Sequence, residues 1–229
     1  MYFHSSYLIL IPGMILMFWA QHRVKATYEK YAEIQSSLGM TGAQVAKTIL
    51  QRMGIHDVTV EQIEGQLTDH YDPSAKAVRL SESVYASSSL AAAAIAAHEC
   101  GHVLQDVRGY QFMNIRASLV PVANIGANFG PVMVMAGLFL SSLGSLSTVF
   151  INIGIILFAG AILFHIVTLP VEFDASSRAL KLIDELGILQ GDENRGARSV
   201  LNAAAWTYVA TAIYAALQLV QLLLMRGDR

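Results

Sequence analysis

The residues best suited to chemistry form the run His98-Glu99-Cys100-Gly101-His102, an H-E-x-x-H pattern. Because residues four apart on an α-helix lie on one face, the imidazoles of His98 and His102 can hold one Zn²⁺. Glu99 lies one position further round the helix, where its carboxylate can reach a water molecule on the metal. Zinc lowers the pKa of such a water to about 7, so that Glu99 can take its proton during attack on a peptide carbonyl. The pattern therefore predicts zinc-dependent peptide hydrolysis with Glu99 as the catalytic base.

The two histidines have other interpretations. They could be core residues whose ring nitrogens are satisfied by hydrogen bonds. A structural zinc in a non-catalytic scaffold usually has Cys or His as its fourth ligand, and no suitable fourth residue is evident. A metal-handling transporter would have no need of Glu99 and would usually place its polar groups at the bilayer midplane. The motif lies outside the apolar segments of the chain, which favours the peptidase.

A catalytic zinc needs a third protein ligand beyond the two histidines. The extension H-x-x-G-x-x-H of one peptidase group is absent, because Gln105 and Arg108 stand where Gly and His would be. The candidates are Glu172, which closely follows the third apolar segment, and its rival Asp174. Two membrane crossings lie between the motif and Glu172, and an even number returns the chain to the same side of the bilayer.

Four apolar segments indicate a multi-pass membrane protein. They cover about 2–20, 118–140, 148–169 and 201–225, and a helix of about 20 residues crosses the hydrocarbon core. The composition agrees, since only 14% of the residues are charged against about 25% in soluble domains. The first segment lacks a positively charged start, and Arg23 and Lys25 follow it, which favours an uncleaved anchor over a signal peptide.

The polar regions 21–117 and 170–200 are expected to form a small α+β lobe of zincin type. A helix is predicted over 22–37, a second from its cap at Thr41 to Met53, and a strand near 76–81. Ser87 to Ser89 can cap a helix over about 90–106, which carries the motif. The fold class is therefore mainly α, with four transmembrane helices and this lobe in a single domain, 1–229.

The placement of cations predicts the orientation and the partners of the protein. Of the 15 Lys and Arg residues, 13 lie in the two polar regions, so the positive-inside rule places the lobe in the cytoplasm. The net charge of −2 offers no basic surface for nucleic acid. We therefore expect contact with the lipid bilayer and a protein or peptide substrate associated with the membrane.

The H-E-x-x-H helix, followed after a membrane hairpin by Glu172-Phe173-Asp174-Ala175-Ser176, resembles the membrane gluzincins of the HtpX and CAAX-prenyl protease groups. The resemblance to the smaller YugP-type neutral zinc metallopeptidases is closer and extends over most of the chain. It includes the N-terminal anchor, the alanine-rich run before the motif, the central hairpin and the last hydrophobic helix. This resemblance implies that His98, His102 and Glu172 bind zinc and that Glu99 is the base.

The resemblance also implies supporting residues around the ligands. The larger families carry Asp where this chain has Ser176, and that Asp usually orients a metal ligand through a hydrogen bond. Either Asp174 or Asp106 then takes over this task or the support is lost, and Asp106 lies four residues after His102 on the same helix face. The strand near 76–81 is expected to receive the substrate backbone by strand addition.

Overall fold

The computed structural model describes residues 5–140, 142 and 144–227. These residues divide between two compact units, which we call the helical unit and the mixed unit. The helical unit comprises the described parts of 1–20, 111–170 and 207–229, and the mixed unit comprises 21–110 and 171–206. The first three residues of the predicted segment 2–20 lie outside the described residues.

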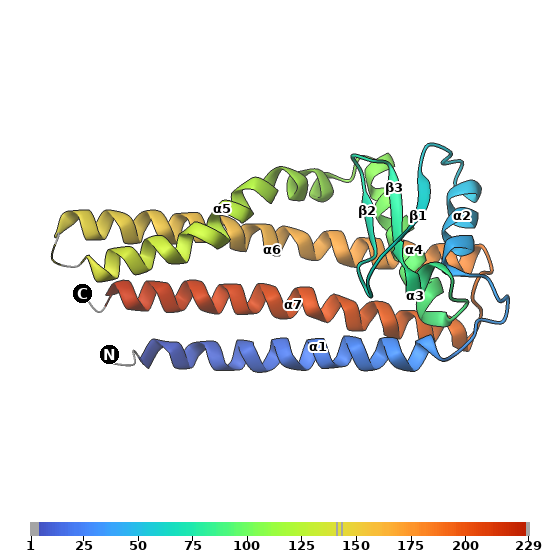
Figure 1. Cartoon of the computed structure of the whole chain (residues 1–229), viewed down its shortest axis with the longest axis horizontal. Helices are drawn as coiled ribbons and strands as arrows, with labels where there is room; N and C mark the ends of the chain where they lie inside the picture. The colour runs from blue at the N-terminus through green and yellow to red at the C-terminus, as the bar shows by residue number, and fades with distance from the viewer. Residues whose placement is uncertain (1–4, 141, 143, 228–229) are drawn as a thin grey trace. The chain divides into compact units, whose positions relative to one another are not determined.

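Within the described residues, four helical segments are long and apolar enough to cross a membrane. They are η1 (Ser5–Leu10) together with α1 (Ile11–Ala32), α5 (Gln111–Phe139), α6 (Ser145–Glu185) and α7 (Asp192–Gly227), as Figure 1 shows. The three later helices begin before the predicted apolar segments, and α6 and α7 also end after them. Hydropathy marks only the apolar part of each helix, whereas backbone hydrogen bonding continues into the polar part.

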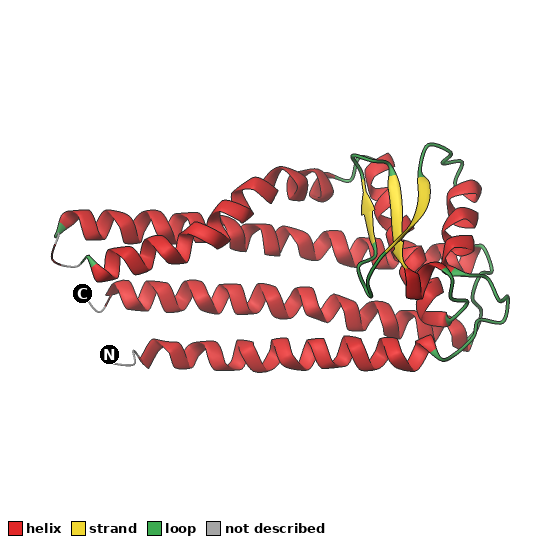
Figure 2. Cartoon of the chain, viewed as in Figure 1, coloured by secondary structure: helices red, strands yellow, loops and turns green. Residues whose placement is uncertain are grey.

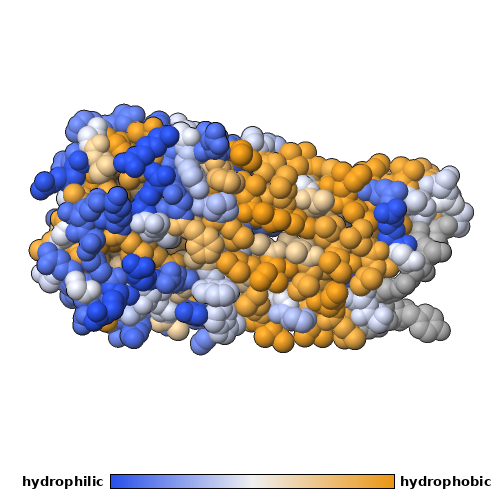
Figure 3. Space-filling model, turned by 180° about the vertical axis from the view of Figure 1, so that it is seen from behind, coloured by the Kyte–Doolittle hydropathy of each residue, from blue (hydrophilic) through white to orange (hydrophobic). Residues whose placement is uncertain are grey.

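Helices α5 and α6 approach so closely that only glycine fits at their contact. A Cβ atom on Gly126 would lie 2.1 Å from the carbonyl oxygen of Leu157, and one on Gly154 would lie 2.6 Å from that of Gly130. Small residues commonly allow such close approach between helices in membranes. Buried apolar side chains extend the core of the helical unit to α7: Val134, Ile151, Phe158, Ile162, Ala215 and Leu222. Hydrophobic side chains also cover the outer surface of this unit on the face in Figure 3.

The mixed unit contains a three-stranded sheet of β1 (Thr59–Ile63), β2 (His70–Asp72) and β3 (Ala77–Ser81), which Figure 2 shows in yellow. The strand order is β1-β3-β2, and β3 pairs parallel with β1 and antiparallel with β2. The strand predicted near 76–81 is therefore confirmed. The expectation that this strand receives substrate backbone is wrong, because β1 and β2 already pair with its two edges.

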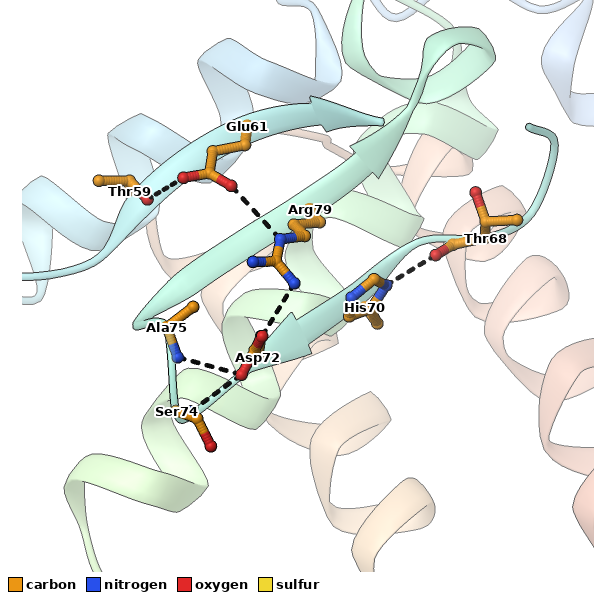
Figure 4. Close-up of polar contacts among 8 residues, drawn as sticks. All are labelled: Thr59, Glu61, Thr68, His70, Asp72, Ser74, Ala75 and Arg79. Atoms are coloured by element: carbon orange, nitrogen blue, oxygen red, sulfur yellow. Dashed lines mark hydrogen bonds and ion pairs between the residues drawn. The ribbon is translucent and has the colours of Figure 1, made fainter. Parts of the chain in front are cut away.

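The outer face of the sheet is polar and centred on Arg79 of β3 (Figure 4). Arg79 donates through Nη1 to Oδ2 of Asp72 at 2.8 Å and through Nε to Oε2 of Glu61 at 3.3 Å. These two ion pairs connect the three strands across the exposed face. Val78 and Leu80 alternate with Arg79 and are fully buried, so the opposite face of the sheet packs against the interior of the mixed unit.

Three further helices lie wholly within the mixed unit: α2 (Gly42–Arg52), α3 (Glu82–Tyr85) and α4 (Leu90–Val107). The unit also contains the parts of α1, α6 and α7 that fall within 21–32, 171–185 and 192–206. The cap predicted at Thr41 is confirmed, since its hydroxyl accepts the Gln44 N–H while the Gln44 side chain accepts the Thr41 N–H. The helix predicted over 90–106 is confirmed as α4. The fold class, mainly α with a small α+β lobe, is therefore confirmed as well.

The helix predicted over 22–37 ends earlier, at Ala32 of α1. Beyond it, the carbonyl of Ile34 accepts the N–H of Leu90 at 2.8 Å, and the N–H of Ser36 donates to the carbonyl of Ser88 at 2.9 Å. The backbone after α1 thus pairs with the segment that leads into α4. This long-range pairing replaces the last helical turn that the local pattern predicts.

Candidate metal centre

Helix α4 carries the H-E-x-x-H motif through the interior of the mixed unit. The hydroxyl of Ser89 accepts the N–H of Ala92 at 3.2 Å and caps the first turn. The alanine-rich run that follows is buried, because its small side chains let neighbouring elements pack closely around the helix. The thiol of Cys100 is also buried and lies 3.7 Å from the carbonyl oxygen of Ala46. Burial raises the pKa of this thiol, so Cys100 is a packed side chain that points away from the histidines.

The structure brings His98 and His102 of α4 together with Glu172 of α6. Oε2 of Glu172 lies 3.3 Å from Nε2 of His98 and 3.6 Å from Nε2 of His102. The potential ligand atoms of the three residues all lie within 4.8 Å of one another. Donors bound at 2.0–2.2 Å to one tetrahedral zinc are roughly 3.4 Å apart. Two imidazoles and one carboxylate at these separations could hold a zinc ion, and they would supply three of its four ligands.

The site is buried, and the pKa values of its two carboxyl groups are shifted in opposite directions. Burial raises the pKa of Glu99, an effect that the neighbouring His98 and His102 oppose only in part. Burial also acts to raise the pKa of Glu172, which lies beyond the apolar part of α6, but hydrogen bonds from both histidines outweigh it and lower that pKa. Glu99 is thus suited to take up a proton, and Glu172 to remain ionised beside a cation.

The other ring nitrogen of each histidine has its own partner. Oγ of Ser176 lies 3.2 Å from Nδ1 of His98, and Oε1 of Gln105 lies 3.0 Å from Nδ1 of His102. Both partners leave the Nε2 atoms free to face Glu172. Ser176 thus lies at the position where it can orient a histidine itself, although the larger families carry Asp there.

Gln105 is the residue near the site that the sequence reasoning missed. Its side chain is fully buried, and its Nε2 donates to the carbonyl oxygen of Val171 at 2.7 Å and to Oδ2 of Asp174 at 2.8 Å. The signal was its spacing, since a residue three positions after His102 lies on the same helix face. Asp174, the rival ligand, contacts this amide and Nε of Arg178, at 2.5 Å.

Asp106 lies apart from the two histidines. Its Oδ2 accepts hydrogen bonds from the hydroxyl of Tyr71 at 2.7 Å and from Nζ of Lys76 at 2.9 Å. Tyr71 belongs to β2, and Lys76 directly precedes β3, so Asp106 ties the end of α4 to this hairpin. The hydrogen bonds of its carboxylate therefore support the sheet, while Gln105 occupies the place beside His102.

Comparison with known proteins agrees with the resemblance seen in the sequence. A family model described as "Putative neutral zinc metallopeptidase" matches residues 6–227. The chain is 42% identical over 217 residues to a protein of Bacillus subtilis (strain 168) named "Putative membrane protease YugP", and the match covers 95% of this chain and 94% of that protein. No solved structure matches the chain. With nearly its whole length matched, the chain belongs to the family of neutral zinc metallopeptidases.

Proposed function

We propose that the protein is a zinc-dependent endopeptidase that hydrolyses peptide bonds in membrane or membrane-associated proteins. The observation that carries the proposal is the convergence of His98, His102 and Glu172 beside the buried carboxyl group of Glu99. A structural site would close its fourth position with another protein ligand. Among the described residues, the one cluster of potential metal ligands contains three groups, His98, His102 and Glu172.

Each residue of the cluster has a role in this proposal. His98, His102 and Glu172 would hold the zinc ion. When bound, zinc acts as a Lewis acid and makes a nucleophile available at neutral pH. Glu99 takes a proton from the attacking water and passes it to the leaving amine. Its raised pKa suits a group that must both accept and release a proton.

Strand β2 is the better candidate to receive the substrate. In the part of the chain that the structure describes, β2 pairs with β3 along one edge only. An extended peptide can add to such an edge through backbone hydrogen bonds. Asp106 and Tyr71 hold β2 against α4, so a peptide bound to this edge would run beside the helix that carries the motif.

The proposal extends to the location of the protein and to its organisation. We place the whole chain, 1–229, in one membrane metallopeptidase domain with the lobe on the cytoplasmic face. Two observations support this placement: the four apolar helices and the 13 of 15 cations that lie in the two polar regions. Substrates would then be proteins or peptides that reach this face at the membrane.

The deciding experiment compares the wild-type chain with Glu99→Gln in nanodiscs, measuring zinc content and cleavage together. Both proteins should retain about one zinc per chain, because Glu99 is not a ligand. Cleavage of a membrane-inserted protein should fall by about 10²–10⁴-fold in the variant, the usual range for losing a general base. Glu29→Gln, a change at an exposed carboxylate of α1, is the matched control and should cleave normally.

Three outcomes would count against the proposal. Absence of zinc from the wild-type protein would refute the metal site. Zinc binding without cleavage of soluble or membrane-inserted substrates would favour a non-catalytic zinc protein. Cleavage of soluble peptides alone would retain the peptidase and refute the membrane-associated substrate class.

A further inference from the structure

We infer that Gln105 fixes the tautomer of His102, keeping the proton on Nδ1 and directing the lone pair of Nε2 to the metal. The inference rests on the proposed function, since it assigns a positioning residue to the same zinc site. It starts from one contact, the 3.0 Å separation between Nδ1 of His102 and Oε1 of Gln105. A neutral imidazole can donate or accept at Nδ1, so this contact alone leaves the tautomer open.

The remaining contacts of Gln105 determine which way its amide points. Its Nε2 lies 2.7 Å from the carbonyl oxygen of Val171 and 2.8 Å from Oδ2 of Asp174. A carbonyl oxygen can only accept. Oδ2 of Asp174 also accepts a hydrogen bond from Nε of Arg178. Turning the amide over would set its oxygen against two acceptors in a fully buried place, where an unmatched polar atom is strongly unfavourable.

The orientation of the amide then decides the state of His102. Since Oε1 can only accept, Nδ1 of His102 must carry the proton and donate it. In neutral His102, Nε2 then carries no proton and has a free lone pair. It lies 3.6 Å from Oε2 of Glu172. A cation bound between this nitrogen and the Glu172 carboxylate would be attracted to both. The contacts of Gln105 thus favour metal binding between His102 and Glu172.

The two histidines differ in how strictly they are held. The partner of Nδ1 in His98 is the hydroxyl of Ser176, which can rotate to donate or to accept. Gln105 has no such freedom, because Val171 and Asp174 hold its amide. Val171 is also the neighbour of Glu172 in α6, so the same amide joins the helix of the histidines to the helix of the carboxylate ligand. His102 should therefore be the more rigid of the two imidazole ligands.

A second-site rescue experiment tests whether Gln105 orients His102. Gln105→Glu keeps the size and the acceptor for His102 but replaces the donor that faces Val171 and Asp174 with an oxygen. We expect zinc affinity to fall by about 10–100-fold, the range typical of residues that orient metal ligands. Asp174→Asn in the same chain supplies an amide donor to the new carboxylate and should recover about tenfold of the loss, a coupling that neighbouring residues in one network show.

The measurement is zinc affinity by chelator competition on the full-length purified chain, with thermal unfolding of the zinc-free protein as a check of folding. Gln105→Leu, which removes the acceptor and keeps the site packed, is a second variant in case Gln105→Glu does not fold, and it should also lose about 10–100-fold. Cys100→Ala is the matched control, because this side chain is buried in the same helix but points away from the histidines. It should lower thermal stability and leave zinc affinity unchanged.

Each result separates the inference from the proposed function. Loss in Gln105→Glu with recovery in the double variant supports the inference, because a purely structural role for Gln105 would not produce recovery. Wild-type affinity in Gln105→Glu overturns the inference and leaves the zinc site intact. Loss without recovery overturns it too. If the wild-type chain itself binds no zinc, the proposed function fails and takes the inference with it.

Discussion

A methyl group on Gly101 would lie 2.4 Å from the carbonyl oxygen of Ala175. Helices α4 and α6 are therefore in backbone contact one residue before His102 and three residues after Glu172. Nothing larger than hydrogen fits at this crossing, because even a Cβ atom would overlap the main chain of the other helix. This contact is what lets a carboxylate of α6 reach the imidazoles of α4.

Gly101→Ala should therefore damage both the fold of the mixed unit and the metal site. Overpacking typically costs about 1–3 kcal/mol, and a clash with backbone belongs at the upper end of that range. Zinc affinity should fall as well, because the helices must separate. Thermal unfolding and chelator competition measure the two effects. Gly227→Ala is the matched control in α7, where an added Cβ meets nothing within 4 Å; equal effects of the two substitutions would contradict the role of the crossing.

Removal of zinc should destabilise the wild-type protein. A ligand that binds only the folded state stabilises it by about 2.7 kcal/mol when present at 100 times its dissociation constant. A chelator should therefore lower the melting temperature of the wild type. Glu172→Gln lacks the anionic ligand, and its melting temperature should not respond to the chelator. Glu185→Gln, a control at an exposed carboxylate of α6, should respond like the wild type. A wild-type response in Glu172→Gln would show that Glu172 is not a ligand.

Ser176→Ala should weaken zinc binding moderately. The change removes the hydroxyl that lies 3.2 Å from Nδ1 of His98, so the ring loses its orienting partner but keeps its Nε2. We expect zinc affinity to fall by about tenfold, the lower end of the range for residues behind the ligands. Ser199→Ala is the control, because this hydroxyl bonds the carbonyl of Arg195 one turn earlier in α7. Unchanged zinc affinity in Ser176→Ala would show that Ser176 does not orient His98 for metal binding.

The carboxylate of Asp106 should make the stability of the mixed unit depend on acid pH. Burial acts to raise its pKa, but hydrogen bonds from Lys76 and Tyr71 outweigh it, and the pKa is lowered. A carboxyl with a lowered pKa in the folded state contributes stability that is fully present above its ordinary value of about 3.9. This contribution is lost as the pH falls through the lowered value.

Asp106→Asn should therefore be less stable than the wild type at pH 7, by up to about 1 kcal/mol because solvent screens this partly exposed ion pair, and the difference should shrink below about pH 4. Thermal unfolding of the zinc-free proteins across this pH range is the measurement, because metal binding then adds no pH dependence of its own. Asp192→Asn, at an exposed position, should change little at any pH. A constant difference between the wild type and Asp106→Asn would contradict the assigned pKa direction.

The local features of the fold could be predicted from the sequence because their causes are local. The cap at Thr41, the start of α4 after Ser89 and the apolar part of each long helix depend on residues within one or two turns. The H-E-x-x-H spacing places two imidazoles on one face of any α-helix. The meeting of the motif with Glu172 also follows the expected topology, although its separations depend on the packing of α4 against α6.

The features that the sequence did not predict depend on contacts between distant segments. Helix α1 stops at Ala32 because the next residues pair with the backbone before α4. The strand at 77–81 lies in the centre of the sheet because β1 joins it in parallel, which no local alternation can show. Gln105 was missed because glutamine is an ordinary helix residue, and its role depends on Val171 and Asp174 of another helix.

Cys100 is the single thiol of the chain, and its full burial makes the protein convenient for labelling with membrane-impermeant maleimides. The native sulfur is shielded and mostly protonated, so the wild-type chain should not react. A cysteine placed at the exposed position Lys47 of α2 would then be the one reactive site. Labelling of intact cells would show that the mixed unit faces outward, and labelling only after the cells are opened would show that it faces the cytoplasm. The experiment requires no cysteine-free background.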